Sequence, residues 1–184
     1  LQDLALRSYQ SAAEGAPTMF NPLAGQGRLY VARHEAAKAV RPLLDAGRID
    51  PKNADVLFLL GAAYQELQQP GEALRALEAS VRLVQRAEAY WRISQIYRDA
   101  NQGQPAAAAV GNATHLAAET EKQTGKTVPW LTEALYLQGR VNLDLHNDAA
   151  ARDAWLLYVA RNPRPSAQLT EVKRLLGTTL RGPR

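Results

Sequence analysis

The feature that most constrains this chain is an internal repeat with a period of about 34 residues. In one copy a small residue, Gly61, is followed at fixed spacings by Tyr64, Ala73, Leu77 and Ser80. The pattern recurs in three other places, with these residues in the equivalent positions: Gly27, Tyr30, Ala39, Leu43 and Ala46; Ser94, Tyr97, Ala106, Val110 and Ala113; Gly139, Asn142, Ala151, Trp155 and Tyr158. A chain with such a period is expected to fold as a stack of similar units.

Each copy contains two predicted amphipathic helices, because apolar residues recur at spacings of three and four. A short polar turn such as "LQQPGE" or "LHND" joins them. A glycine inside a helix costs about 1 kcal/mol relative to alanine, so Gly61 indicates a close approach of the second helix. We expect the small residues at 27, 61, 94 and 139 to face those at 39, 73, 106 and 151. Prolines 17, 51 and 163 are expected to end second helices.

These units predict an all-α, right-handed solenoid. Its predicted segments are the second helix of a truncated repeat at 1–19, full repeats at 20–53, 54–86, 87–131 and 132–163, and a capping helix with a tail at 164–184. Residues 1–19 match the second half of a copy through Ala5, Tyr9, Ala12 and Pro17, so we expect the chain to be cut from a longer array.

Two segments depart from the regular period. In 87–131 the second helix is predicted to run to about Thr124, with Gly125 as its cap and a loop through Pro129. After Pro163, Ser166 is predicted to cap a helix. Its apolar stripe is Leu169, Val172, Leu175 and Leu176. We expect this stripe to close the end of the stack, and pairing with another copy is the alternative.

The pattern resembles the tetratricopeptide repeat over residues 1 to about 163. In that family the first helices line a concave groove. The resemblance therefore implies a non-catalytic scaffold that binds a protein or peptide partner, as part of a larger bacterial assembly or localisation protein acting in secretion, pilus formation, motility or polarity. By family analogy, a small GTPase or a secretion or pilus component is a candidate partner.

The resemblance also implies the groove residues: Phe58, Trp91, Tyr136, Arg28, Gln95, Arg98, Arg140, Asp55 and Glu88. We expect the three aromatic residues to form an open ladder, and packing between hairpins is the alternative. The arginines are expected to contact an acidic side chain of the partner. Trp130, in the predicted loop, is a secondary candidate, although packing on an adjacent helix is the favoured interpretation. The lysine- and asparagine-rich clamp of chaperone-binding members is missing from these positions, so we expect no chaperone-tail recognition.

Composition leaves two other functions open. The net charge of +4 and the arginine content allow a nucleic-acid or membrane-surface binder, which scattered arginines on helices do not favour. Self-association through 1–19 or through the C-terminal stripe is the other alternative, and a homo-oligomer is its expected result. The chain has no cysteine, which fits a reducing cytoplasm or a disulfide-free periplasmic protein, with the cytoplasm favoured. No apolar run approaches the roughly 18 residues of a membrane span.

Short sequences that resemble ligand-binding motifs lack the residues or the secondary structure that those motifs require. Gly125-Lys126-Thr127 lacks the earlier glycine of a phosphate-binding loop, and Gly25-x-Gly27 has no strand before it. The histidines at 34, 115 and 146 have no metal-ligand spacing. We therefore predict no catalytic residue, no metal site, no cofactor and no enzymatic activity.

Overall fold

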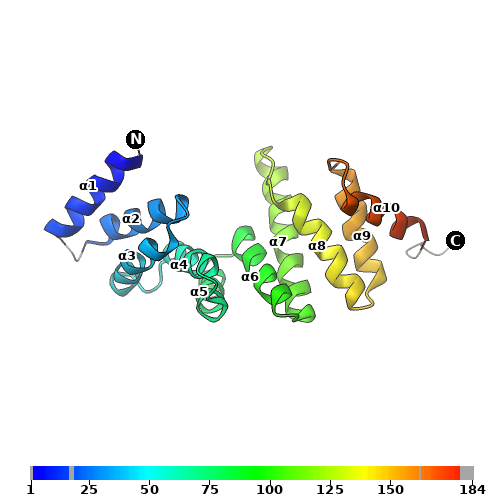
Figure 1. The fold of residues 1–184 in the computed structure, drawn as a ribbon, viewed down its shortest axis with the longest axis horizontal. Coiled ribbons are helices and arrows are strands. Elements are labelled where there is room, and N and C mark those ends of the chain that lie inside the picture. The colour runs from blue at the N-terminus through cyan, green and yellow to red at the C-terminus, as the bar shows by residue number, and fades with distance from the viewer. Residues whose placement is uncertain (1, 17–18, 162, 179–184) are drawn as a thin grey trace. The chain divides into compact units, whose positions relative to one another are not determined.

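The computed structural model describes residues 2–16, 19–161 and 163–178, and these residues form ten helices and no strand (Figure 1). The helices are α1 (Gln2–Gly15), α2 (Phe20–Ala32), α3 (Ala36–Ile49), α4 (Ala54–Glu66), α5 (Pro70–Leu83), α6 (Ala87–Asp99), α7 (Gly103–Thr124), α8 (Leu131–Asp144), α9 (Asp148–Ala160) and α10 (Ala167–Thr178). The predicted all-α class is confirmed. Pro17, which was expected to end a helix, lies outside the described residues.

The chain divides into two compact units, unit 1 (Leu1–Gln85) and unit 2 (Arg86–Arg184). Unit 1 holds α1 and two helical hairpins, α2/α3 and α4/α5. Unit 2 holds the hairpins α6/α7 and α8/α9, followed by α10 (Figure 1). We propose that the repeats predicted from the sequence correspond to these hairpins. One limit is corrected, because α8 already begins at Leu131, inside the segment predicted as 87–131.

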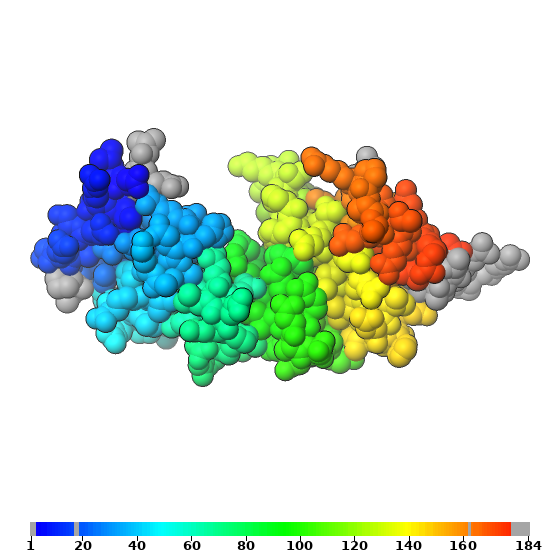
Figure 2. All heavy atoms as spheres, viewed as in Figure 1, coloured from blue at the N-terminus to red at the C-terminus, as the bar shows by residue number. Residues whose placement is uncertain are grey.

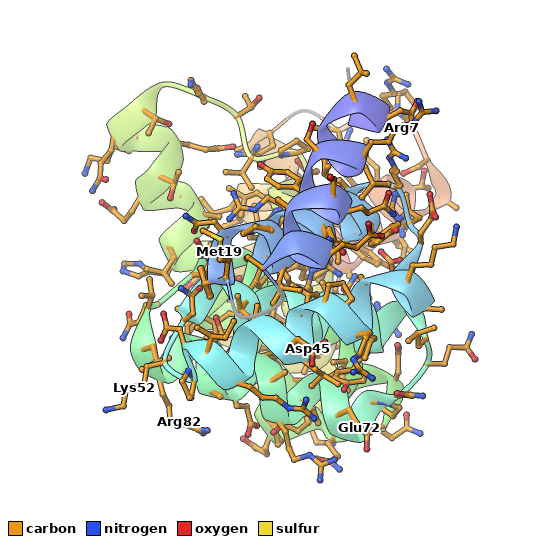
Figure 3. The ribbon with its side chains drawn as sticks, turned by 90° about the vertical axis from the view of Figure 1, so that its left-hand side faces the viewer. Arg7, Met19, Asp45, Lys52, Glu72 and Arg82 are labelled. Carbon is orange, nitrogen blue, oxygen red and sulfur yellow. The ribbon has the colours of Figure 1, made fainter. Side chains whose placement is uncertain are left out.

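The repeat positions on the second helices form the cores of the two units. Eleven of them have no exposed surface: Ala39, Leu43, Ala46, Ala73, Leu77, Ser80, Ala106, Val110, Ala113, Ala151 and Trp155. Charged side chains such as Lys52 and Arg82 lie on the outside of unit 1 (Figure 3). The period in the sequence therefore reflects which side chains each hairpin buries.

Glycines on the first helices make room for one large side chain of the second helix. A Cβ atom added to Gly61 would lie 2.5 Å from Cγ of Leu77, and one added to Gly27 or Gly139 would overlap Leu43 or Trp155. The expected close approach of the helices is confirmed. The residue expected to face each glycine is corrected. The glycine contacts the large residue of the second helix, such as Leu77, which lies one turn beyond the small residue, such as Ala73.

The turn inside each hairpin has one residue in the left-handed conformation, at the same position of the repeat. His34, Gln68, Asn101 and His146 have φ angles of 58°, 57°, 55° and 57°. The backbone N–H of the next residue donates to the backbone carbonyl of the residue in the tyrosine position of the repeat. The Gln69 N–H, for example, donates to the Tyr64 carbonyl at 2.9 Å. This is the Schellman arrangement, in which glycine is the usual left-handed residue. None of the four turns uses glycine there, so each bears a backbone cost.

Gln68→Gly is expected to raise the free energy of unfolding by about 1 kcal/mol, because a left-handed conformation costs a non-glycine residue roughly 1–2 kcal/mol. Asn101→Gly is the matched control and should gain less, since asparagine tolerates this conformation better. Urea unfolding followed by circular dichroism measures both. A loss of stability in Gln68→Gly, or equal gains in the two variants, would contradict the assignment of cost to this turn.

The helix end predicted in the first irregular segment and the helix start predicted in the second are both confirmed. Helix α7 runs to Thr124, and Gly125 caps it at φ 67° while its N–H donates to the Glu121 carbonyl at 2.8 Å. The end of α7 and the loop after it project from the rest of unit 2 (Figure 2). At the start of α10, Ser166 Oγ accepts from the Leu169 N–H at 3.2 Å.

The apolar stripe of α10 is covered within the chain itself. Val172 has no exposed surface and Leu175 is buried, and both belong to a core cluster with Trp155 and Leu131. Leu169 and Leu176 are partly buried against the same cluster. The stripe therefore closes the core of unit 2, and its alternative use as an open pairing surface is not supported.

Candidate functional site

The predicted aromatic ladder is not open in the structure. Phe58 on α4 is 8% exposed and Trp91 on α6 is 5% exposed. Trp91 stacks on Trp130, with ring centroids 5.8 Å apart and an angle of 3° between the planes. The favoured interpretation of Trp130 is thus confirmed, because it packs on a residue of a neighbouring helix. Phe58 and Trp91 are corrected from partner contacts to interior residues, because both side chains are buried and neither lines the hollow described below.

The predicted arginines already have carboxylate neighbours in the chain. Arg98 pairs with Asp99 at 2.8 Å, and Arg140 pairs with Glu171 at 2.7 Å. In unit 1, Arg28 lies 3.9 Å from Asp55, and both side chains are largely exposed. These arginines therefore already have a carboxylate neighbour within the chain, and their contact with an acidic side chain of a partner stays a prediction.

Two other predicted residues lie on α6. Glu88 accepts from the Arg92 guanidinium at 3.3 Å. Gln95 is half-buried. Neither lines the hollow described next.

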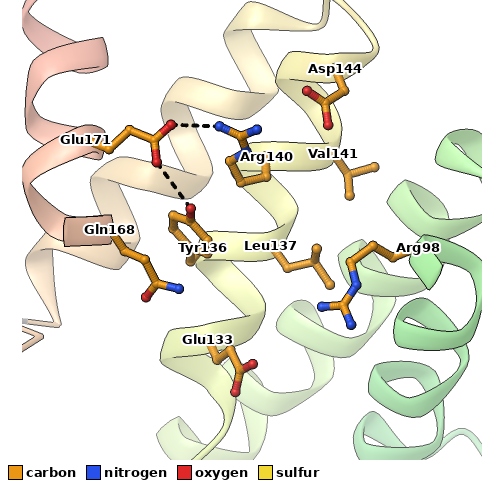
Figure 4. Close-up of a pocket in the computed structure, with 9 residues that line it drawn as sticks. All are labelled: Arg98, Glu133, Tyr136, Leu137, Arg140, Val141, Asp144, Gln168 and Glu171. Atoms are coloured by element: carbon orange, nitrogen blue, oxygen red, sulfur yellow. Dashed lines mark hydrogen bonds and ion pairs between the residues drawn. The ribbon is translucent and has the colours of Figure 1, made fainter. Parts of the chain in front are cut away.

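Three of the predicted residues meet in one hollow of unit 2, with a volume of about 500 Å³ (Figure 4). Arg98 enters it from α6, and Tyr136 and Arg140 enter it from α8. The remaining lining residues are Glu133, Leu137, Val141 and Asp144 from α8, and Gln168 and Glu171 from α10. The hollow thus has walls from three helices, and α8 forms most of its floor.

Glu171 fixes one wall of this hollow. One of its carboxylate oxygens accepts from Arg140 at 2.7 Å, and the other accepts from the Tyr136 hydroxyl at 3.4 Å (Figure 4). Burial raises the pKa of the Tyr136 phenol, and the charge of Glu171 raises that pKa further. The phenol is therefore a proton donor at neutral pH, and the three side chains form a preorganised polar wall.

The sequence reasoning missed the contribution of α10. Its apolar stripe was visible as a pattern of spacings, whereas Gln168 and Glu171 lie outside that stripe and outside the repeat. Val172 and Leu175 pack into the core of unit 2, and Glu171 on the same helix contacts Arg140 of α8. A single carboxylate on a capping helix carries no sequence signal of this role.

A second polar cluster holds the loop that carries Trp130. Arg161 donates two hydrogen bonds to the Glu121 carboxylate, at 2.7 and 2.9 Å, and a third to Thr132 Oγ1 at 2.9 Å. Glu121 also accepts from the Val128 N–H at 2.6 Å. This Glu121–Arg161 clamp fixes the loop between α7 and α8, and bidentate geometry makes such a pair specific.

Glu121→Gln is expected to lower the free energy of unfolding by about 2 kcal/mol at pH 7, the usual worth of hydrogen bonds to a charged group. The Arg161 hydrogen bonds lower the pKa of Glu121, so its stabilisation is present above the ordinary pKa of about 4.3. It disappears as the pH falls through the folded-state value. Urea unfolding from pH 7 to pH 3 should show the two proteins converging at low pH, and a constant difference would contradict the clamp.

Several solved structures have a fold similar to that of this chain. The crystal structure of MamA superimposes with a TM-score of 0.68 at 18% identity, over 96% of this chain and 91% of that one. YrrB, described as a TPR protein with an unusual peptide-binding site, gives 0.71 at 21% identity, over 94% and 84%. PilF of Pseudomonas aeruginosa gives 0.70 at 18% identity, over 91% and 72%.

Other comparisons found nothing: no protein-family model matches the chain, and no curated protein matches it in sequence. The structural likeness is enough to establish the fold. The chain has the all-α tetratricopeptide repeat fold that its period predicts. None of the described helices combines the length and the apolar character needed to cross a membrane.

Proposed function

We propose that the chain is a non-catalytic scaffold module that binds a protein or peptide segment at the hollow of unit 2. The observation that carries this proposal is the hollow itself, where buried apolar residues lie among charged side chains from three helices. Leu137 and Val141 are each 6% exposed and form an apolar floor. An apolar floor with a polar rim is the usual composition of a binding surface.

Two further observations support this proposal. YrrB, which has a similar fold, is described as having a peptide-binding site. Several basic side chains elsewhere lie beside carboxylates, as Arg41 and Arg48 do with Asp45, which compensates part of the positive charge that a phosphate backbone would contact. We therefore favour a protein partner over a nucleic acid, within a bacterial assembly or localisation protein.

Charge reversal at the rim tests the proposal without disturbing a core. Glu133 and Asp144 are both exposed, so Glu133→Arg/Asp144→Arg changes the hollow alone. Glu14→Arg/Asp153→Arg is the matched control, because these carboxylates are also exposed, outside the hollow, and change the net charge equally.

Affinity capture from native lysate, read by mass spectrometry, compares the three proteins. We expect a set of proteins that wild type and control retain and the hollow variant loses. Equal retention by all three proteins would contradict binding at this hollow. Circular dichroism and thermal unfolding confirm that both variants keep the fold.

A further inference from the structure

The charges around the hollow are not balanced. Among its lining residues, Arg98 and Arg140 are positive, whereas Glu133, Asp144 and Glu171 are negative. Arg98 is further compensated by Asp99, and Arg140 by Glu171. The hollow therefore carries an acidic excess on a chain whose net charge is +4.

The acidic excess comes from two carboxylates, Glu133 and Asp144. Among the residues that the structure describes, no ion pair or side-chain hydrogen bond joins Glu133 or Asp144 to another group. Both are exposed, and they lie at opposite ends of the hollow (Figure 4). Glu171, the third carboxylate, is occupied by Arg140 and Tyr136.

The two free carboxylates are in line with the apolar floor. Glu133, Leu137, Val141 and Asp144 follow one another on α8 at spacings of four, four and three residues, which places them on one helix face. At 1.5 Å per residue, the backbone positions of Glu133 and Asp144 are about 16 Å apart. An extended segment covers that length with about five residues, at roughly 3.3 Å each.

We propose that the hollow selects a protein segment with an apolar residue between two basic residues. The apolar residue covers Leu137 and Val141, and the lysine or arginine side chains on either side reach Glu133 and Asp144. The apolar residue keeps water out of the hollow, while the charges at the rim determine which segments dock. This inference rests on the proposed function and replaces the acidic partner expected from the arginines of the sequence.

Selection from a displayed library of random 12-residue peptides on the full chain tests this inference. The enriched peptides are then measured by fluorescence anisotropy against three variants. Glu133→Gln/Asp144→Asn removes the two charges at nearly constant shape. Arg98→Gln removes the positive charge on the α6 wall. Gln168→Trp places a bulky group on the exposed α10 rim and leaves both carboxylates in place.

We expect enriched peptides with a lysine or arginine on each side of an apolar residue. Their affinity should fall at least tenfold in Glu133→Gln/Asp144→Asn and with rising salt, because exposed charges are screened. Gln168→Trp should also weaken them, whereas Arg98→Gln should raise their affinity, because it removes a positive charge that repels the basic side chains.

Two other results separate the inference from the function on which it rests. Peptides that are weakened by Gln168→Trp, but lack basic residues and keep their affinity in Glu133→Gln/Asp144→Asn, would overturn the inference and leave the binding hollow standing. If no selected peptide is sensitive to Gln168→Trp, or none is enriched, both the inference and peptide binding at the hollow are wrong. Thermal unfolding of each variant checks that a lost affinity is not a lost fold.

Discussion

Gly139→Ala is expected to lower the free energy of unfolding by about 3 kcal/mol, because overpacking a filled core typically costs 1–3 kcal/mol and the neighbour here is rigid. The new methyl group would overlap the indole ring of Trp155. That ring has no exposed surface, and its Nε1–H donates to the Tyr136 carbonyl at 3.2 Å. It cannot move aside without losing this hydrogen bond and shifting α9.

The matched control is Gly71→Ala on α5. Nothing lies within 4 Å of a Cβ atom added there, so the change in stability should be a gain below about 1 kcal/mol or none. Urea unfolding followed by circular dichroism gives both values. A Gly139→Ala protein within about 0.5 kcal/mol of wild type would show that α8 and α9 separate freely.

Trp155→Ala is expected to destabilise the protein by about 4 kcal/mol, the usual cost of removing a large buried aromatic side chain. The indole fills the core of unit 2 together with Leu131, Tyr158 and Val172. Its removal also leaves the Tyr136 carbonyl without the indole hydrogen bond. Hydrogen exchange should show the loss as reduced protection of amides in α8, α9 and α10.

Leu156→Ala is the control for this prediction. Leu156 is the next residue on α9 and is 45% exposed, so the change should stay within about 0.5 kcal/mol. Similar losses in the two variants would contradict the central role of the indole. The double variant Gly139→Ala/Trp155→Ala should cost less than the sum of its parts, because the alanine methyl group then occupies vacated space.

Much of this core could be predicted from spacing alone. Residues such as Ala39, Leu43 and Trp155 recur at positions that a helical hairpin must bury, so the period indicates both the helices and the buried face. The end of α7 at Thr124 also follows from local chemistry, since Gly125 adopts the left-handed cap without a side-chain penalty.

The binding surface could be predicted only in part. Tyr136, Arg98 and Arg140 were identified from their places on first helices, and they line the hollow. The stacking of Trp91 on Trp130 and the pairing of Arg140 with Glu171 join residues from different helices, so no local pattern indicates them. The choice between an exposed and a buried aromatic residue is therefore made by tertiary contacts.

The Glu121–Arg161 clamp changes what counts as a module in this chain. Repeat arrays are commonly shortened, lengthened or recombined one hairpin at a time, because each hairpin contacts only its neighbours through similar surfaces. Here the overlong α7 of one hairpin is bound to the last residues of the next, through Arg161. A transplant that carried α8/α9 without α7 would leave that guanidinium with no carboxylate to bind. The smallest exchangeable cassette at this end of the chain is thus a pair of hairpins, α6 to α9, inherited or engineered together.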